Sequence, residues 1–228
     1  MKLYLLLPLM LIINCNKNVV DKTVEISLQK NAVEDSITEF YVDSVHIGSK
    51  GNFKLELKRI SCKDSIYADI HLFKFQNNKW VEKQHFAFEK DGILGCDPEY
   101  KDFNNDGYSD FTYVSGIAAR GANEIRSLFI FDPKKGNLQF IKNSPEFPNL
   151  QYNKELDCID AFSVYGGCSS YFLKISKDSL CPFARIDLFN GYREIYTIKA
   201  NGKETLIKRD KSEETYLRYK NFSPLEEY

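Results

Sequence analysis

Short alternating runs of apolar and polar residues dominate the chain from Glu39 onward. Each run is rich in aromatic and β-branched residues and is bounded by Gly, Pro, Asn or Asp, which is the pattern of a half-buried β-strand. No segment keeps a helical period over a dozen residues. The sequence therefore predicts an all-β protein, with strands that include residues 53–57, 70–75, 111–114, 128–131, 171–175 and 195–198.

Three expected hairpins share the order of aromatic strand, polar turn and apolar strand. Their turns lie at residues 76–79, at residues 132–137 and at Asn201-Gly202. Asn-Gly is a strong signal for a tight hairpin, because both central residues of such a turn have positive φ. Recurrence of the unit roughly every 55 to 70 residues predicts small antiparallel sheets in a propeller-like array. A β-sandwich built from the same hairpins is the alternative that periodicity leaves open.

The one strongly apolar stretch covers residues 3–13 and follows Lys2. A basic residue before about a dozen apolar residues is typical of a secretory signal peptide, and the stretch is too short to span a bilayer. It ends at Cys15, and residues 11–14 resemble a bacterial lipobox, in which the Cys thiol receives a diacylglycerol before cleavage. Asn14 departs from the usual Gly, Ala or Ser, and an ordinary signal peptide with an incidental Cys is the alternative.

This N-terminus predicts three parts of the chain: a lipoprotein signal peptide at 1–14, lipidated Cys15 with a flexible tether at 15–38, and one β-rich domain at 39–228. We expect the lipid to anchor the protein to the bacterial outer membrane, facing the periplasm. The formal net charge of -1 and the pI near 6.3 argue against nucleic acid as a partner.

Export would place the remaining cysteines in an oxidising compartment, where pairs of thiols are expected to close. Five such residues follow Cys15, namely Cys62, Cys96, Cys158, Cys168 and Cys181. The odd number allows at most two disulfides within one chain, and the sequence leaves their connectivity open. The three histidines, His46, His71 and His85, do not join the cysteines in a ligand pattern, so the sequence predicts no zinc site.

Residues 102–110, DFNNDGYSD, fit the pattern D-x-N-x-D-G-x-x-D. Oxygen donors at alternate positions of a tight loop converge on one point, because the Gly allows a sharp bend. Such hard oxygen ligands favour calcium, and the expected ligands are Asp102, Asn104, Asp106, the carbonyl of Tyr108, and Asp110.

An EF-hand would carry a Glu at position 12 of this loop and helices on both sides. Tyr113 stands at that position within an expected strand, so we expect Asp110 to replace the missing Glu. The bound calcium would be structural, since crowded carboxylates repel one another without a cation. The alternative is a polar β-turn made by Asp, Asn and Gly alone.

Residues 102–116 are similar to the calcium loop and following strand of FG-GAP and VCBS-type propeller repeats. Segments 127–140, 145–150 and 162–167, with the hairpin around Tyr196, resemble a narrower group. These are periplasmic propeller-like lipoproteins that act as immunity proteins against lysozyme-like peptidoglycan-cleaving toxins of bacterial secretion systems. The resemblance covers about residues 70–209 and implies a non-catalytic inhibitor whose partner is a lysozyme-like toxin or another secreted protein.

Catalytic patterns such as G-x-S-x-G, H-E-x-x-H and a Gly-rich phosphate loop do not occur in the sequence. His71 alternates within an apolar strand, where a packed imidazole is expected rather than a catalyst. We therefore expect a binding protein and no enzyme. A cell-surface carbohydrate-handling or adhesion lipoprotein is the alternative, and a peptidoglycan-active enzyme is a third interpretation.

Tyr165 is the candidate contact with the partner. It precedes Gly166-Gly167 between two expected strands, and we expect the paired glycines to let the loop turn sharply and leave the ring with few neighbours. Tyr is favoured at interfaces because it buries a large area at a small entropic cost. A saccharide-binding cleft could accept such a ring. The alternative is that Tyr165 packs on the next strand.

Overall fold

The structure is a computed structural model, and it describes residues 36–228. The expected signal peptide, Cys15 and most of the expected tether lie outside the described residues. Strand β1 (Ser36–Asp43) begins before Glu39, so residues 36–38 belong to a strand rather than to the tether. Within the described range, no helix has the length and apolar character needed to span a membrane.

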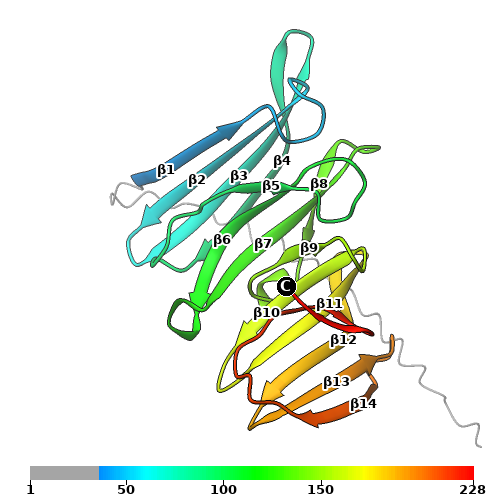
Figure 1. Cartoon of the computed structure of the whole chain (residues 1–228). Coiled ribbons are helices and arrows are strands. Elements are labelled where there is room, and N and C mark those ends of the chain that lie inside the picture. The colour runs from blue at the N-terminus through cyan, green and yellow to red at the C-terminus, as the bar shows by residue number, and fades with distance from the viewer. Residues whose placement is uncertain (1–35) are drawn as a thin grey trace, which may run out of the picture. The chain divides into compact units, whose positions relative to one another are not determined.

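Two four-stranded antiparallel sheets come first along the chain (Figure 1). The first sheet consists of β1, β2 (Phe53–Cys62), β3 (Ser65–Gln76) and β4 (Lys79–Lys90). The second sheet consists of β5 (Glu99–Lys101), β6 (Asp110–Ala118), β7 (Asn123–Asp132) and β8 (Asn137–Ile141). In both sheets each strand pairs with the next one in the sequence.

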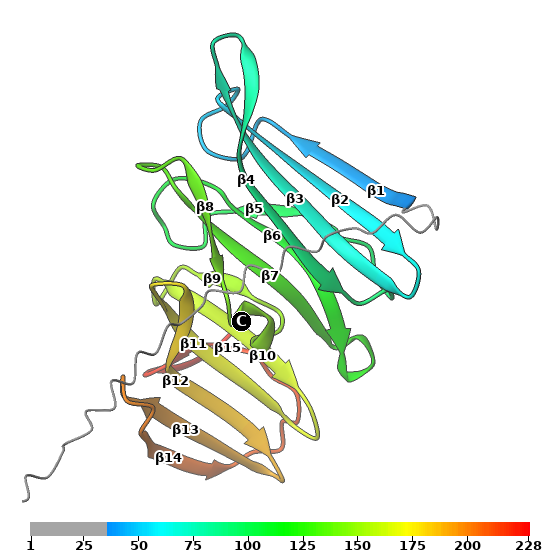
Figure 2. The ribbon, with the colours of Figure 1, turned by 180° about the vertical axis from the view of Figure 1, so that it is seen from behind.

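The third sheet has six antiparallel strands, which also follow one another in sequence order (Figure 2). They are β9 (Gln151–Asn153), β10 (Cys158–Val164), β11 (Cys168–Ser176), β12 (Ser179–Phe189), β13 (Tyr192–Ile198) and β14 (Glu204–Lys211). A terminal hairpin pairs β15 (Tyr219–Phe222) with β16 (Leu225–Glu227). Two short 3₁₀ turns, η1 (Ala119–Gly121) and η2 (Ser144–Glu146), complete the described elements. The predicted all-β fold of small antiparallel sheets is confirmed.

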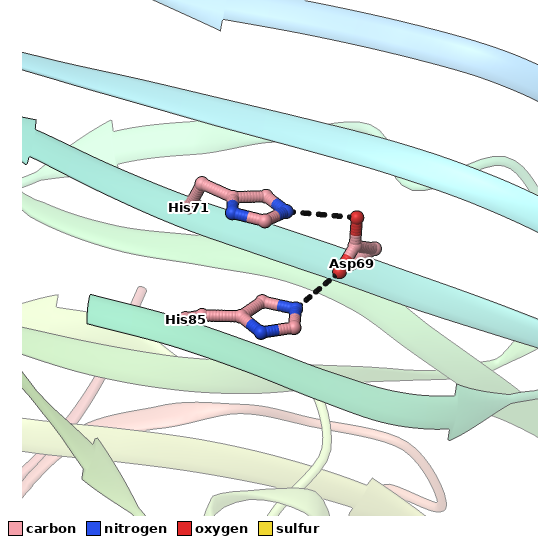
Figure 3. Close-up of side chains that lie close together, drawn as sticks. All are labelled: Asp69, His71 and His85. Carbon is pink, nitrogen blue, oxygen red and sulfur yellow. Dashed lines mark hydrogen bonds and ion pairs between the residues drawn. The ribbon is translucent and has the colours of Figure 1, made fainter. Parts of the chain in front are cut away.

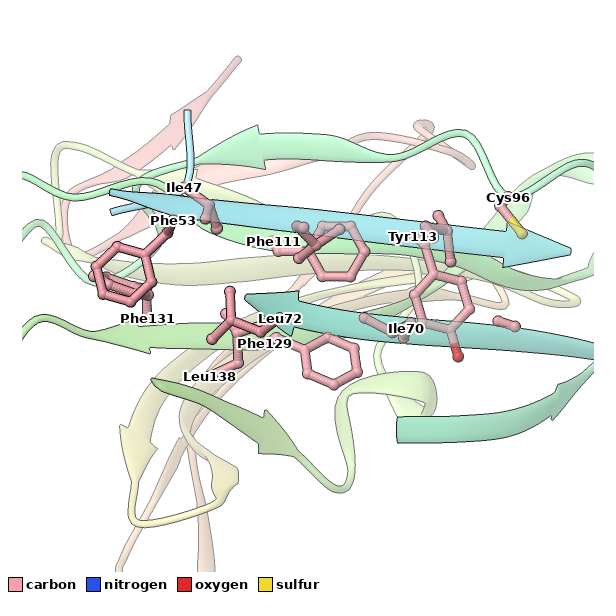
Figure 4. Packing of buried hydrophobic residues seen from close by; sticks show 13 residues of the cluster. Ile47, Phe53, Ile70, Leu72, Cys96, Phe111, Tyr113, Phe129, Phe131 and Leu138 are labelled. Carbon is pink, nitrogen blue, oxygen red and sulfur yellow. The ribbon is translucent and has the colours of Figure 1, made fainter. Parts of the chain in front are cut away.

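Side chains of β7 explain how the sheets are held together, because successive residues of a strand point to opposite faces. Phe129 and Phe131 join the core shared with the first sheet, whereas Leu128 and Ile130 join the core shared with the third sheet. The second sheet is therefore buried on both faces. Figure 4 shows the first of these cores, in which Ile70 and Leu72 of the first sheet meet Phe111, Tyr113, Phe129 and Phe131. Leu55 and Leu57 of the first sheet belong to the same core.

A third core joins the six-stranded sheet to the terminal hairpin through Phe172, Ile186, Leu188 and Tyr219. The sheets thus share cores in chain order and none of them closes on itself. Each neighbouring pair of sheets resembles a sandwich, and the series resembles consecutive propeller blades. Both architectures named from the sequence are compatible with this arrangement.

The turns of two expected hairpins differ in their backbone conformation. Asn77 and Asn78 both have positive φ between β3 and β4, as a two-residue turn of type I′ requires. Between β13 and β14, Gly202 has a φ of 79° and Asn201 is not among the residues of positive φ. The Gly202 N–H donates to the Lys199 carbonyl, so this hairpin has a longer turn that ends in a left-handed Gly. The hairpin is confirmed, but the expectation of positive φ at both central residues is wrong.

Cys96, Cys158, Cys168 and Cys181 are free thiols in the described part of the chain. The expectation that exported thiols pair is therefore wrong for these four residues in this structure. Burial raises the pKa of Cys96 to about 11 and the pKa of Cys158 to about 12. A protonated, buried thiol is a weak nucleophile, so both residues act as small core side chains.

Candidate functional site

The loop at residues 102–110 connects β5 to β6, and its last residue, Asp110, begins β6. Gly107 has a φ of 85° and Asn105 one of 58°, so the bend expected from the sequence is present. Phe103 is buried in the core between the second and third sheets. The loop is therefore fixed to the fold from the inside, while Asn104, Asn105 and Asp106 are exposed.

Side-chain oxygens of the loop accept hydrogen bonds from the loop's own backbone. The Asp102 carboxylate accepts from the N–H groups of Asp106, at 3.2 Å, and Gly107, at 2.8 Å. Asn104 Oδ1 also accepts from Asp106 N–H, and Asp106 Oδ1 accepts from Tyr108 N–H at 2.9 Å. This is the network of a polar turn. A carboxylate oxygen that accepts one hydrogen bond keeps a further lone pair for another donor or a cation.

Asp110 has a structural role that the motif does not predict. Its carboxylate is fully buried, and it accepts hydrogen bonds from Phe103 N–H at 2.8 Å and Phe131 N–H at 2.9 Å. Burial raises the pKa of Asp110 to about 7, the two backbone hydrogen bonds oppose this rise, and the nearby Asp106 and Asp102 add to it. Asp110 thus ties the loop to β7 across the second sheet.

The donor set of the loop fits a hard cation by its chemistry, since it offers carboxylates, an amide oxygen and a carbonyl. The three carboxylates are not, however, drawn together in this conformation. Among residues 36–228, the only group of three His, Cys, Asp or Glu side chains with ligand atoms within 4.8 Å of one another lies elsewhere. Tyr113, at position 12 of the motif, is wholly buried in the first core, so an EF-hand is excluded here.

Tyr165 lies in the turn between β10 and β11, with 46% of its surface exposed. Its ring is 6.1 Å from the Phe189 ring, measured between centroids, and Phe189 is itself 49% exposed. The Tyr165 hydroxyl lies 2.9 Å from Ser169 Oγ, and Ser169 Oγ donates to Asp187 at 2.7 Å. The ring is therefore exposed as expected but has more neighbours than expected, because both its face and its hydroxyl are in contact with the sheet.

The two glycines after Tyr165 matter for the room that they leave for neighbouring atoms, and not for their backbone torsion angles. Neither Gly166 nor Gly167 has positive φ. A Cβ at Gly167 would lie 2.1 Å from the Leu188 carbonyl oxygen, a distance that no side chain tolerates. The expected sharp turn is present, since only residues 165–167 connect β10 to β11, and Gly167 is required because β12 approaches its backbone closely.

A hollow of about 240 Å³ adjoins Phe189 on the third sheet. Arg209 lies over the Tyr192 ring at 4.2 Å and pairs with Glu194 at 3.1 Å. The surface beside Tyr165 therefore combines exposed aromatic rings with charged hydrogen-bonding groups. The residues lining the hollow are Asp187, Phe189, Asn190, Tyr192, Glu194 and Arg209.

The group of three that meets the 4.8 Å criterion is Asp69, His71 and His85 (Figure 3). His71 Nε2 lies 2.9 Å from Asp69 Oδ2, and His85 Nε2 lies 2.6 Å from Asp69 Oδ1. The two imidazole rings are stacked, with centroids 4.3 Å apart. Burial opposes the charge of Asp69, but the hydrogen bonds from both histidines outweigh it and hold the pKa of Asp69 below its usual value.

The position of His71 differs from the sequence-based expectation. Ile70 and Leu72 enter the first core, so His71 points to the other face of the first sheet. It lies there among carboxylates, with Nδ1 3.0 Å from Glu82 Oε2, and it does not pack in the apolar core. This cluster is not apparent in the sequence, because His71 and His85 lie on different strands and only the strand register brings them together.

No family model matches the sequence, and no curated protein does either. Among solved structures, the chain is similar to one described as "Structure of a Xanthomonas Type IV Secretion System related protein". The identity is 13%, the TM-score is 0.46, and the match covers 77% of this chain and 97% of that chain. A likeness at this level says nothing about function. The resemblance to FG-GAP and VCBS-type repeats and to immunity lipoproteins stays a prediction.

Proposed function

We propose that this chain is a non-catalytic inhibitor of a lysozyme-like peptidoglycan-cleaving toxin, anchored by a lipid on Cys15 to the periplasmic face of the bacterial outer membrane. The observation that carries the proposal is the half-exposed Tyr165 ring on the turn between β10 and β11. A ring presented in this way can enter the saccharide cleft of such an enzyme and block it without chemistry.

The contacts behind Tyr165 favour this function because they limit the motion of the ring. Phe189 lies against its face, and Ser169 holds its hydroxyl. Asp187 holds Ser169 and accepts a hydrogen bond from Arg185 Nε at 2.8 Å. A side chain that is already ordered loses little entropy on binding, so more of its contact energy contributes to affinity.

Calcium at the loop is the second part of the proposed function. Asp102, Asn104, Asp106, the Tyr108 carbonyl and Asp110 would hold the ion. The support for it is the set of hard oxygen donors around the bend at Gly107. Bound calcium would neutralise the crowded carboxylates and stabilise the connection between β5 and β6.

Truncation of Tyr165 tests the inhibitory surface. The readout is the clearing of a peptidoglycan suspension by a panel of lysozyme-like enzymes, titrated with the protein. Tyr165→Ala should weaken inhibition by roughly 2 kcal/mol, which is about 30-fold, as for a central interface residue. Tyr165→Phe keeps the ring and loses only the hydroxyl contact with Ser169, so it should lose much less.

Phe40→Ala is the matched control, since Phe40 is an aromatic residue of β1 with 55% of its surface exposed. It should inhibit as well as the parent. The melting temperature of each variant shows whether the substituted residue contributes to folding or only to the interface. If Tyr165→Ala inhibits as strongly as the parent, or if no enzyme of the panel is inhibited, the proposed function is wrong. A large loss of thermal stability would instead assign Tyr165 to the core.

The lipid anchor has its own test because Cys15 lies outside the described residues. Cys15→Ser should move the protein from the membrane fraction to the soluble fraction, since several acyl chains make anchoring durable. A wild-type protein found in the soluble fraction would contradict the anchor and leave the inhibition experiment unaffected.

A further inference from the structure

We propose that Asp69, His71 and His85 bind a zinc ion on the outer face of the first sheet, with a fourth position left to water. All three side chains project from two adjacent strands, the inner strand β3 and the edge strand β4. His71 and His85 are direct cross-strand partners, and Asp69 is two residues before His71 on the same face. Facing residues of paired strands are near enough for their side chains to share one ligand.

The distances favour one ion between the three side chains. Zinc bonds of about 2.0–2.1 Å place the ligand atoms of a tetrahedral site roughly 3.3 Å apart. The ligand atoms of Asp69, His71 and His85 already lie within 4.8 Å of one another. The stacked rings would have to tilt by side-chain rotation so that both nitrogen lone pairs meet at one ion.

Glu82 supplies the outer contact that metal-bound histidines usually have. His71 Nδ1 lies 3.0 Å from Glu82 Oε2, while His71 Nε2 faces Asp69. A carboxylate only accepts hydrogen bonds, so a proton on His71 Nδ1 can be donated to Glu82. In that tautomer Nε2 has a lone pair for zinc, and the bond from Nδ1–H to Glu82 holds the ring in this orientation.

The donor set selects the class of cation. Two imidazole nitrogens and one carboxylate suit zinc and its transition-metal neighbours, whereas calcium and magnesium prefer oxygen alone. The side chains of Asp69 and His71 are 15% and 16% exposed, so both are largely shielded, and His85 is 48% exposed. The open side at His85 is where water, or a side chain of a binding partner, would complete the site.

The experiment is a calorimetric titration of the full chain with zinc chloride, in a calcium-containing buffer that keeps the loop at 102–110 supplied with its own cation. The expected result is one zinc per chain. Removing an outer contact of a metal-binding His lowers affinity about 10- to 100-fold. Glu82→Gln should fall in that range, and His71→Ala and His85→Ala should each lose at least as much.

His46→Ala is the matched control. His46 also pairs with a carboxylate, since its Nδ1 lies 2.7 Å from Asp43 Oδ2, but it has no second His beside it. Its removal should leave zinc affinity unchanged. Cys181→Ser removes the exposed thiol and should also change nothing. His85→Asn provides a second variant at the more exposed ligand, and the melting temperature of every variant reports its folding.

The proposal is overturned if wild-type protein takes up no stoichiometric zinc. It is overturned equally if folded His71→Ala and His85→Asn bind zinc as tightly as the parent, or if His46→Ala or Cys181→Ser accounts for the binding. None of these results depends on inhibition of a lysozyme-like enzyme, so this site and the proposed function fail or succeed separately.

Discussion

The loop at 102–110 and the cluster of Asp69, His71 and His85 both gather metal-binding donors, but the chain builds them in different ways. The loop takes all its donors from nine consecutive residues, and its carboxylates accept hydrogen bonds from the loop's own backbone and from β7. The cluster takes its donors from two strands, and its side chains contact one another. A recognisable motif therefore need not be the most preassembled group of ligands.

The two sites also differ in what they do for the fold. Asp110 connects the loop to the second sheet from a fully buried position. Asp69, His71 and His85 lie on the face of the first sheet that points away from its core. We therefore expect changes in the loop's last residue to affect folding, and changes in the cluster to affect metal binding with little effect on folding.

The largest expected effect is that of Asp110→Ala on stability. The change leaves two buried N–H groups, those of Phe103 and Phe131, without an acceptor. Each unsatisfied group costs about 1–3 kcal/mol, so the free energy of unfolding should fall by about 4 kcal/mol. Urea denaturation in the presence of EDTA measures this loss without any contribution from calcium.

Asp106→Ala is the control for that experiment, because Asp106 is exposed. In EDTA it should lose less than about 1 kcal/mol. Equal losses in the two variants would mean that the buried hydrogen bonds of Asp110 contribute no more to the free energy of unfolding than the exposed Asp106 does. The contrast between buried and exposed residues of the loop would then be wrong.

The second expected effect is the response to calcium. A ligand that binds only the native state adds about 2.7 kcal/mol when present at 100 times its dissociation constant. Calcium should therefore raise the melting temperature, EDTA should reverse the rise, and Asp106→Ala should abolish it. An identical melting curve with and without chelator would show that the loop binds no calcium and is a polar turn. The hydrogen bonds within the loop are already those of such a turn.

The local features of the fold could be predicted from the sequence because each depends on neighbouring residues. The strands around Phe111 and Phe129 follow from alternation, and the β3–β4 turn follows from Asn77-Asn78. The loop was recognisable for the same reason, since its donors are consecutive. The burial of both faces of β7 was harder to predict, because a sequence does not say which sheets cover the two faces of a strand.

The cluster could not be predicted, and a β-bulge is the physical reason. The turn at Asn77-Asn78 pairs Gln76 with Lys79 and Phe73 with Glu82. Continued without interruption, this register would pair Ile70 with His85 and direct His85 to the core face. The register shifts between Leu72 and Phe73, so His85 pairs with His71 instead. One extra residue moves every following side chain to the opposite face.

The third prediction tests this bulge directly. Lys83 has no partner in β3, because Glu82 pairs with Phe73 and Gln84 pairs with Leu72. Deleting Lys83 should therefore straighten β4 while leaving His85 opposite His71. We expect a change of about 1 kcal/mol or less in the free energy of unfolding, as for a substitution away from the core, and zinc affinity within a few-fold of the parent.

Deletion of Ala87 provides the comparison, since Ala87 pairs with Asp69 beyond the bulge. The bulge can absorb its loss only by pairing His85 with Ile70, which turns His85 to the core face, so this deletion should destabilise the protein several times more than the loss of Lys83 and abolish zinc binding. If both deletions are equally harmful, or if deleting Lys83 abolishes zinc binding, the bulge is not what brings His85 to the face of His71.

The smallest expected effect is that of His85→Ala on the metal-free protein. The side chain is 48% exposed, and its Nε2 pairs with Asp69 Oδ1 near the surface. Such pairs contribute about 0–1 kcal/mol, so the free energy of unfolding in EDTA should change by less than about 0.5 kcal/mol. With zinc at 100 times its dissociation constant, the parent should gain about 2.7 kcal/mol and the variant almost none. Paired urea titrations with and without zinc measure this difference. A variant that is strongly destabilised without metal would show that the cluster, like Asp110, stabilises the fold itself. The two sites would then differ only in how far apart their residues lie in the sequence.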